Sequence, residues 1–255
     1  MDNKNINLPG LIAHRGYSSH FPENTLRSFQ EAFLSGACFV ECDVQLTKDL
    51  VPVVLHDSDL SRISGVAAYV HQINYSELRK LSAGYIDKFG SQFGSEKFPS
   101  LEEFADLLSQ WAGRKAFVEI KRSSIRNFGT EIVLESILPI LDKVFDQVTI
   151  ISFDYDIISQ LALEAEWHIG WVVEQWSENI ITQANLLKPD YFFVDVDCIP
   201  PDVLQLEKFF WYWVLYEIDD PLKARKWVEC GADFIETNDI KQLLQLAPFS
   251  ESGCV

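Results

Sequence analysis

The chain has 255 residues, of which 47% are hydrophobic, and 38 Asp and Glu residues against 21 Lys and Arg give it a formal charge of −17 at pH 7. This length suits one large domain with a full core, and the hydrophobic content argues against a disordered chain. Nucleic acids and anionic membranes are polyanions, so neither is expected as a main partner. An anionic substrate would need a local positive group, such as a metal ion or an arginine.

Cysteine usage and the N-terminus indicate the cytoplasm. The five cysteines are odd in number and contain no CxxC pair, so no disulfide framework is expected. The first ten residues, MDNKNINLPG, are polar, unlike a signal peptide. No apolar run approaches the roughly 20 residues that a transmembrane helix needs. We therefore expect a cytoplasmic protein without stable membrane insertion, and the sequence gives no indication of its oligomeric state.

Short apolar runs rich in strand-forming residues alternate with amphipathic stretches along the chain. The second and third runs are joined by the turn at 47–50 and are expected to form one hairpin, which leaves eight strands if it is counted once. The expected strands are Leu11–His14, Phe39–Val44, Val51–Leu55, Ala116–Ile120, Val148–Phe153, Ile169–Val173, Tyr191–Val196, Trp211–Tyr216 and Phe234–Glu236.

Helix start and stop signals fill most of the gaps between these runs. Asn24 is expected to cap a helix that ends at Gly36. The stretch SLEE at 100–103 is a capping box that begins a second helix. Asp220 followed by a proline begins another, because proline suits the first helical position.

Eightfold alternation of strand and helix predicts a (β/α)₈ TIM barrel that forms a single domain over residues 1–255. A doubly wound open sheet is the alternative, but its first turn is usually rich in glycine, and His14-Arg15-Gly16 is not. The stretch at about 58–98 has weak periodicity and is expected to be a small insertion after the hairpin. It would cap one face of the barrel and contain a short helix at Ser76–Ser82.

Active sites of parallel barrels lie at the carboxyl ends of the strands. Side chains two apart on a strand share a face. Glu41 and Asp43, near the end of the second strand, therefore point the same way, and so do Glu119 and Lys121 at the end of the next parallel strand. The polar residues expected to meet there are His14, Arg15, Glu41, Asp43, His56, Asp57, Glu119 and Lys121.

The three acidic residues of adjacent strands form a candidate metal site. Glu41, Asp43 and Glu119 cannot all stay ionised in one place unless a positive charge lies among them. Oxygen ligands suit hard divalent cations, so we expect these three residues to bind Mg²⁺ or Ca²⁺.

The remaining groups suit phosphodiester cleavage. His14 and His56 are free for proton transfer near neutral pH, and Arg15 and Lys121 can hold phosphate oxygens. A metal, two proton carriers and two cations together indicate hydrolysis of a phosphodiester. Asp57 either orients an imidazole or simply begins the insertion.

Three blocks of this sequence resemble the signature blocks of the glycerophosphodiester phosphodiesterase family: AHRGYSSHFPENT at 13–25, FVECDVQLTKDLVPVVLHDSDLSR at 39–62 and FVEIK at 117–121. The similarity extends more faintly through FPSLEEF, ISFD, YEIDDP and GADFIETND. The resemblance implies a TIM barrel with a small insertion after the second strand.

The resemblance also implies metal-dependent hydrolysis of glycerophosphodiesters to sn-glycerol 3-phosphate and an alcohol. It implies His14 and His56 as the acid–base pair, and it leaves open which of them is the acid. Water and the glycerol 2-hydroxyl both remain possible nucleophiles. For the other positions the resemblance implies Glu41, Asp43 and Glu119 as metal ligands and Arg15 and Lys121 as phosphate contacts.

The chain departs from the family pattern at a few positions. Tyr216 stands where the family often has Trp, and it could pack on the glycerol as a substrate-binding residue. The stretch Glu217-Ile218-Asp219 replaces a frequent Thr-Val-Asn, and Leu50 replaces a turn glycine. These changes leave the proposed metal site and histidine pair intact.

Two alternative functions would each need a further sequence feature. A lysophospholipase D would cleave lysophospholipids and would need an apolar groove, for which Tyr69, Tyr85 and Phe89 of the insertion are candidates. A catalytically silent binding protein on the same fold would show a broken set of histidines or carboxylates, whereas every member is present here.

Other polar residues are expected to be ordinary. His20, His71 and His168 lack acidic or basic company in the pattern, and Asp195 and Asp197 are expected to have a structural or supporting role rather than to bind the metal.

Overall fold

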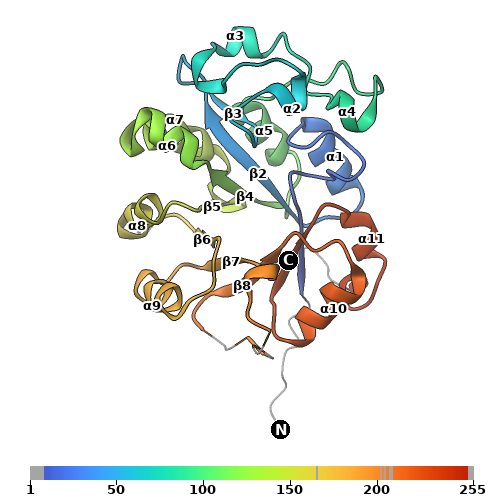
Figure 1. The fold of residues 1–255 in the computed structure, drawn as a ribbon, viewed down its shortest axis with the longest axis vertical. Coiled ribbons are helices and arrows are strands. Elements are labelled where there is room, and N and C mark those ends of the chain that lie inside the picture. Colours follow the sequence, from blue (N-terminus) through green and yellow to red (C-terminus); the bar gives the residue numbers. More distant parts are fainter. Residues whose placement is uncertain (1–8, 165, 202, 204, 207–208, 252–255) are drawn as a thin grey trace.

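The structure is a computed structural model that describes residues 9–164, 166–201, 203, 205–206 and 209–251. Among these residues nine strands form one sheet in the order β1-β9-β8-β7-β6-β5-β4-β2-β3, and β1 also pairs with β2, which closes the barrel (Figure 1). The strands are β1 (Gly10–Ala13), β2 (Phe39–Leu46), β3 (Pro52–Val54), β4 (Lys115–Ile120), β5 (Val148–Ser152), β6 (Ile169–Val173), β7 (Tyr191–Asp195), β8 (Tyr212–Tyr216) and β9 (Phe234–Thr237).

The closed ring of eight parallel strands confirms the predicted TIM barrel. Each strand expected from the sequence is present, with ends that differ by a residue or two. β3 is antiparallel to β2 and forms the predicted hairpin with it. The open-sheet alternative is wrong, because Ile12 pairs with Phe39 and Ala13 with Val40 across the seam between β1 and β2.

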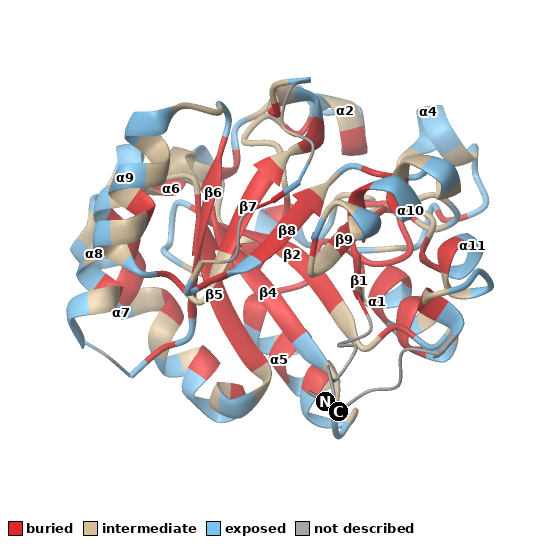
Figure 2. Cartoon of the chain, turned by 90° about the horizontal axis from the view of Figure 1, so that it is seen from below, coloured by how far each residue is buried: buried red, intermediate tan, exposed pale blue. Residues whose placement is uncertain are grey.

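Helices cover the outside of the barrel, and their exposed sides face away from the buried strands (Figure 2). In the described part of the chain, no helix combines the length and the apolar character needed to cross a membrane. Around the barrel the helices are α1 (Leu26–Leu34), α5 (Leu101–Ser109), α6 (Arg122–Phe128), α7 (Thr130–Leu141), α8 (Tyr155–Glu164), α9 (Glu178–Leu187), α10 (Pro221–Glu229) and α11 (Ile240–Leu244), with 3₁₀ turns η2 (Asp142–Gln147), η3 (Val196–Cys198) and η4 (Phe249–Glu251).

Two of the three predicted helix starts are confirmed. Ser100 caps α5 through a capping box with Glu103, and Asp220 caps α10. The prediction for Asn24 is wrong, because Thr25 is the residue whose side chain accepts from the Ser28 N–H at the start of α1. Asn24 instead has a left-handed backbone (φ 57°) and supports the site described below.

The segment between β3 and α5 is the predicted insertion, drawn at the top of Figure 1. It contains α2 (Ser61–Ser64), η1 (Val70–Gln72), α3 (Tyr75–Leu78) and α4 (Ile86–Phe89), so the expected helix at 76–82 is shorter and begins earlier. It has its own small apolar cluster, which includes Leu60, Ile63 and Leu78. Figure 2 shows α2 and α4 near the carboxyl ends of the barrel strands.

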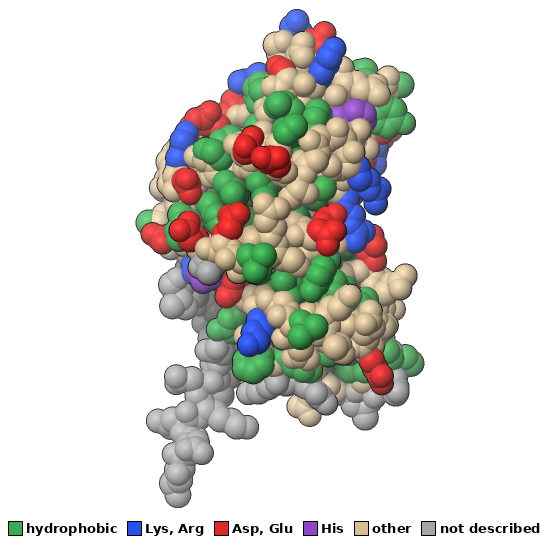
Figure 3. Space-filling model, turned by 90° about the vertical axis from the view of Figure 1, so that its left-hand side faces the viewer, with side chains coloured by type: hydrophobic (Ala, Val, Ile, Leu, Met, Phe, Trp, Pro, Cys, Tyr) green, Lys and Arg blue, Asp and Glu red, His purple; other side chains and the backbone are tan. Residues whose placement is uncertain are grey.

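Three described cysteines, Cys42, Cys198 and Cys230, are free thiols, whereas Cys38 is disulfide-bonded. The N-terminal stretch that argued against a signal peptide lies, up to residue 8, outside the described residues. Figure 3 shows acidic side chains spread over the face that it presents rather than gathered in one place, in keeping with the charge of −17.

An apolar layer fills the barrel beneath the carboxyl ends of the strands. Side chains alternate along each strand, so every second residue points inward. The inward residues at one level form a buried apolar cluster of Ile12, Phe117, Ile151, Val172, Phe193 and Val214. The inward residues nearer the carboxyl ends therefore lie above an apolar floor.

Replacing Phe117 by alanine tests this packing. Phe117 is 1% exposed and its ring contacts Tyr191 and Phe193, so its loss would leave a cavity in the barrel. We expect Phe117→Ala to lower the free energy of unfolding by about 3–5 kcal/mol in urea titrations. Phe210→Ala, at a ring that is 81% exposed, is the control and should change it by less than about 0.5 kcal/mol.

Candidate active site

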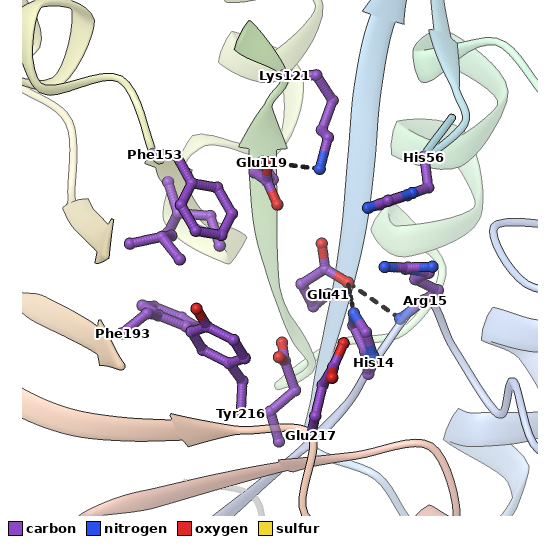
Figure 4. Close-up of a pocket in the computed structure, with 13 residues that line it drawn as sticks. His14, Arg15, Glu41, His56, Glu119, Lys121, Phe153, Phe193, Tyr216 and Glu217 are labelled. Carbon is purple, nitrogen blue, oxygen red and sulfur yellow. Dashed lines mark hydrogen bonds and ion pairs between the residues drawn. The ribbon is translucent and has the colours of Figure 1, made fainter. Parts of the chain in front are cut away.

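A cavity of about 100 Å³ opens at the carboxyl ends of the strands, above the apolar floor (Figure 4). We call it the inner cavity. Eight residues were predicted as the acid–base pair, metal ligands or substrate contacts, and seven of them line it: His14, Arg15, Glu41, His56, Glu119, Lys121 and Tyr216. The eighth, Asp43, is 1% exposed and is in contact with the Arg15 and Lys121 side chains.

The three predicted metal ligands form one carboxylate cluster. One oxygen from each of Glu41, Asp43 and Glu119 lies within 4.8 Å of the others. Asp43 pairs with Arg15 Nε at 3.2 Å and with Lys121 Nζ at 3.1 Å, and Glu119 pairs with Lys121 Nζ at 2.8 Å. The β2–β4 register sets Asp43 directly beside Glu119, which explains why they meet.

Crowding of like charges perturbs these carboxyl groups. Burial raises the pKa of Glu41 well above its ordinary value, and Asp43 and Glu236 raise it further. Burial also raises the pKa of Glu119. Burial acts in the same sense on Asp43, but Lys121 and Arg15 outweigh it and hold the pKa of Asp43 well below its usual range. The proton is therefore retained most readily at Glu41.

The donor set fits a hard divalent cation. Four buried carboxylates, the cluster and Glu236, face two fixed cations, Arg15 and Lys121. Full ionisation would leave two negative charges in excess, which one divalent cation would balance. Within the described residues, Glu41 Oε2 has near it only the backbone N–H of Arg15 at 3.0 Å and His14 Nε2 at 3.9 Å, so it offers oxygen to such a cation.

A tight turn after β1 presents His14 and Arg15 to the cavity. Arg15 and Gly16 both have left-handed backbones, with φ of 55° and 79°. A Cβ on Gly16 would lie 2.4 Å from Ser28 Oγ and 2.6 Å from the Ser28 carbonyl carbon, so only glycine lets α1 approach this closely. The motif His-Arg-Gly thus has a steric cause.

Asn24 holds Asp43 in place. Its Nδ2 donates to Asp43 Oδ2 at 2.8 Å, and its Oδ1 accepts from the Asp43 backbone N–H at 3.2 Å. Through these two hydrogen bonds, the loop between β1 and α1 holds the carboxylate of Asp43 in one orientation. The sequence pattern does not reveal this role, because an Asn just before a helix is also typical of a cap.

His14 is buried between Glu41 and Asn238. Its Nδ1 lies 3.2 Å from Asn238 Oδ1, and its Nε2 points toward the carboxylate cluster. Burial, helped by the charge of Arg15, lowers the pKa of His14 to about 3. The imidazole is therefore neutral over the physiological range.

His56 is held by an acidic partner. Its Nδ1 lies 2.6 Å from Asp57 Oδ1, which decides the open alternative for Asp57 in favour of orienting an imidazole. Asp57 accepts from Arg62, and Arg62 in turn donates to Glu23 at 2.7 and 2.8 Å. Glu23 also accepts from Arg15 at 3.0 Å, so the chain of contacts links Arg15 after β1 with His56 after β3.

A second and larger cavity of about 860 Å³, the outer groove, adjoins the inner one. The two share His56, Glu119, Lys121 and Phe153. His14 lines only the inner cavity, so the two imidazoles differ in what they face. The outer groove also has basic side chains along it, namely Arg62, Arg122 and Arg126.

Two acidic residues of the inner cavity were not predicted. Glu236 is 4% exposed on β9, and Glu217 is an exposed residue after β8 with a left-handed backbone (φ 60°). Alternation along β9 was the available signal, because Phe234, Glu236 and Asn238 share a face. Burial raises the pKa of Glu236 well above its ordinary value, although Arg15 opposes this.

The residues expected to be ordinary line neither cavity: His20, His71, His168, Asp195 and Asp197. Asp195 caps η3, and Asp197 pairs with Lys223. Tyr69, Tyr85 and Phe89, the candidates for an acyl groove, line neither cavity either.

Adding a divalent cation tests the carboxylate cluster without any assay of activity. A ligand that binds only the folded protein at 100 times its Kd raises the free energy of unfolding by about 2.7 kcal/mol. We expect Mg²⁺ or Ca²⁺ to raise the melting temperature. The gain should shrink as the pH falls from 8 to 5, because the raised pKa of Glu41 makes protons compete with the metal at higher pH than for an ordinary carboxylate.

Matched variants identify the source of this stabilisation. Glu41→Gln and Glu119→Gln should each abolish most of the thermal shift, whereas Glu102→Gln on the exposed side of α5 should leave it unchanged. An equal shift in all three variants would place the bound cation elsewhere on the acidic surface.

Known proteins with similar sequences belong to one family. The sequence model described as "Glycerophosphoryl diester phosphodiesterase family" matches residues 14–242. A glycerophosphodiester phosphodiesterase of Caldanaerobacter subterraneus is 32% identical over 246 residues, which cover 92% of this chain and 96% of that protein.

Solved structures of phosphodiesterases have the same fold as this chain. A phosphodiesterase of Oleispira antarctica in complex with sn-glycerol-3-phosphate aligns with a TM-score of 0.84 and 26% identity over 96% of this chain and 98% of that one. A putative glycerophosphoryl diester phosphodiesterase of Silicibacter pomeroyi shares the fold, with a TM-score of 0.82 and 19% identity over 94% and 95% of the two chains. The match over nearly the whole length shows that this chain belongs to the glycerophosphoryl diester phosphodiesterase family.

Proposed function

We propose that this protein hydrolyses glycerophosphodiesters to sn-glycerol 3-phosphate and an alcohol, with a divalent cation held by Glu41, Asp43 and Glu119. The observation that carries the proposal is the convergence of this carboxylate cluster, two imidazoles and two cations on one cavity. Membership of the family and the sn-glycerol-3-phosphate bound to the Oleispira antarctica relative support the same substrate class.

Mg²⁺ or Ca²⁺ is the proposed cofactor, because the ligand atoms are all carboxylate oxygens. When bound, such a cation neutralises charge on the phosphate and favours a deprotonated nucleophile. Lys121 now pairs with Asp43 and Glu119, and we propose that a bound phosphate draws its ammonium group away from them.

Arg15 and Lys121 are the proposed phosphate contacts. Both side chains line the inner cavity and both are cations fixed by Asp43. Their charges would stabilise the additional negative charge that develops on the phosphate oxygens during cleavage. Tyr216, whose hydroxyl donates to the Val173 carbonyl at 2.9 Å, offers its ring to the substrate.

We propose that His14 is the base and His56 the acid. His14 faces the inner cavity, where the glycerol unit would bind, and it is neutral, as a base must be. It takes the proton of the nucleophile, which is either water or the glycerol 2-hydroxyl. His56 lies where the cavity meets the outer groove, and it gives a proton to the alkoxide of the departing alcohol.

The two nucleophiles differ in a detectable product. Attack by the glycerol 2-hydroxyl releases the alcohol and forms a cyclic phosphodiester, which water then opens. Attack by water gives sn-glycerol 3-phosphate directly. Phosphorus NMR of the reaction distinguishes them through the presence or absence of the cyclic species.

We further propose that barrel and insertion act as one domain, and that the protein works in the cytoplasm. The three free thiols favour that compartment, and the disulfide at Cys38 favours an oxidising one. Cell fractionation with an antibody to the protein decides between them. A catalytically silent barrel finds no support, because each proposed catalytic group is in place.

Removing either imidazole tests the main proposal. We expect His14→Ala and His56→Ala to lower kcat for glycerophosphocholine by about 10²–10⁴-fold, since each removes a proton carrier. His20→Ala, at an exposed histidine outside both cavities, should retain full activity. Release of sn-glycerol 3-phosphate is measured with a coupled dehydrogenase. Undiminished turnover by both site variants would refute the proposal.

The leaving group separates the acid from the base. A 4-nitrophenyl ester of glycerol phosphate has a phenolate leaving group that needs little protonation. With this substrate the defect of His56→Ala should become small, while the defect of His14→Ala persists. The reverse pattern would exchange the two roles.

A further inference from the structure

One buried carboxylate of the inner cavity is neither a proposed metal ligand nor a proposed acid, base or phosphate contact. Glu236 lies on β9 and lines the cavity, yet it is only 4% exposed. Within the described residues its side chain forms no hydrogen bond or ion pair, and only longer-range charges act on it. Buried polar groups nearly always have a partner, so a lone carboxyl aimed into a cavity indicates a ligand.

Glu236 lies low in the cavity, next to its apolar floor. It lies two residues before Asn238, which contacts His14, and so about 6.6 Å further down the strand at 3.3 Å per residue. Its register partner on β1 is Ile12, a member of the apolar floor. The cavity residues Ile151, Val172 and Phe193 on that floor offer no hydrogen bonds from their side chains.

A glycerol phosphate bound in this cavity would extend from the phosphate contacts toward the floor. Its phosphate would lie near Arg15 and Lys121 at the level of the carboxylate cluster. Its terminal hydroxyl is the group farthest from phosphorus, and it would otherwise be buried against apolar side chains without a partner. Glu236 lies beside the floor, and within the described residues its carboxyl group has no hydrogen-bond partner of its own.

We propose that Glu236 hydrogen-bonds the terminal hydroxyl of the glycerol unit and thereby makes the enzyme specific for diesters of unacylated glycerol. This inference rests on the proposed function. A lysophospholipid carries an acyl ester at the terminal position, which removes the hydroxyl and needs space that a cavity of about 100 Å³ above a closed floor does not have. The alcohol on the other side of the phosphate would lie in the outer groove of about 860 Å³, where its size matters less.

A cycle that varies both enzyme and substrate tests the contact. The substrates are glycerophosphocholine and its analogue that lacks the terminal hydroxyl. The wild-type enzyme should prefer glycerophosphocholine by about 10- to 100-fold in kcat/KM, the value of one buried hydrogen bond. Glu236→Leu should lose that preference, and Glu236→Gln, which can still hydrogen-bond, should keep most of it. An unchanged preference in Glu236→Leu would overturn the proposal.

Glu217 supplies the matched control. It is a second carboxylate that lines the same cavity, but it is exposed, so Glu217→Leu removes the same charge without removing the deep partner. This variant should keep the preference for the terminal hydroxyl. A similar loss of preference in both variants would show that charge in the cavity, rather than a hydrogen bond from Glu236, selects the substrate.

Two further readouts separate specificity from other roles. Glu236→Leu should raise the melting temperature, because an unpartnered buried carboxyl becomes apolar, so loss of activity through misfolding would be visible. Its thermal shift with Mg²⁺ or Ca²⁺ should persist, reduced only by the loss of one nearby negative charge. A loss as large as that of Glu41→Gln would assign Glu236 to the metal site and overturn the inference.

Failure of the inference and failure of the proposed function give different results. Absence of wild-type activity on every glycerophosphodiester would overturn the proposed function. Equal wild-type turnover of glycerophosphocholine and its analogue, or comparable turnover of 1-acyl-lysophosphatidylcholine, would overturn only the role of Glu236.

Discussion

The structure around the barrel mouth depends on the balance between buried carboxylates and a smaller number of fixed cations. Asp43 stays ionised because Arg15 and Lys121 contact it, and that arrangement leaves Glu41 with a raised pKa and little positive charge of its own. Burying charges of one sign without balance is strongly unfavourable, so the fold keeps a place that favours a divalent cation. The ion pairs of Asp43 thus also leave beside them a carboxylate cluster whose oxygens suit a divalent cation.

The regular geometry of the barrel is enough to bring these charged groups together. Closing eight parallel strands makes every second side chain point inward, so carboxyl groups from β2 and β4 meet without special loops. The loops then add what strands do not: the turn after β1 brings in Arg15, and the end of the hairpin brings in His56. Beneath both, Phe117 and its apolar neighbours keep water from entering through the barrel.

Much of this arrangement could be predicted from the sequence, and the failures have physical causes. Strand positions followed from short apolar runs, and the capping box at Ser100 needed only local chemistry. Asn24 was misplaced because Asn and Thr are both good caps, and only the tertiary contact with Asp43 decides between them. Glu236 was missed because a single acidic residue at the end of a strand looks like a solvated terminus. The closure of the barrel, which no local pattern reveals, turns it inward.

The left-handed residues around the site carry a further consequence. Arg15, Asn24 and Glu217 all have a positive φ, in conformations that side-chain-bearing residues seldom adopt. Each such backbone conformation raises the free energy of the folded state by about 1–3 kcal/mol, and contacts elsewhere in the fold must offset this cost. Directed evolution toward heat tolerance would be drawn to these positions, where glycine relaxes the backbone, and would damage the enzyme there. Leu50 also has a left-handed backbone (φ 61°), but it lies in the hairpin turn and lines neither cavity. Glycine at this position would relax the backbone without removing a side chain from the site.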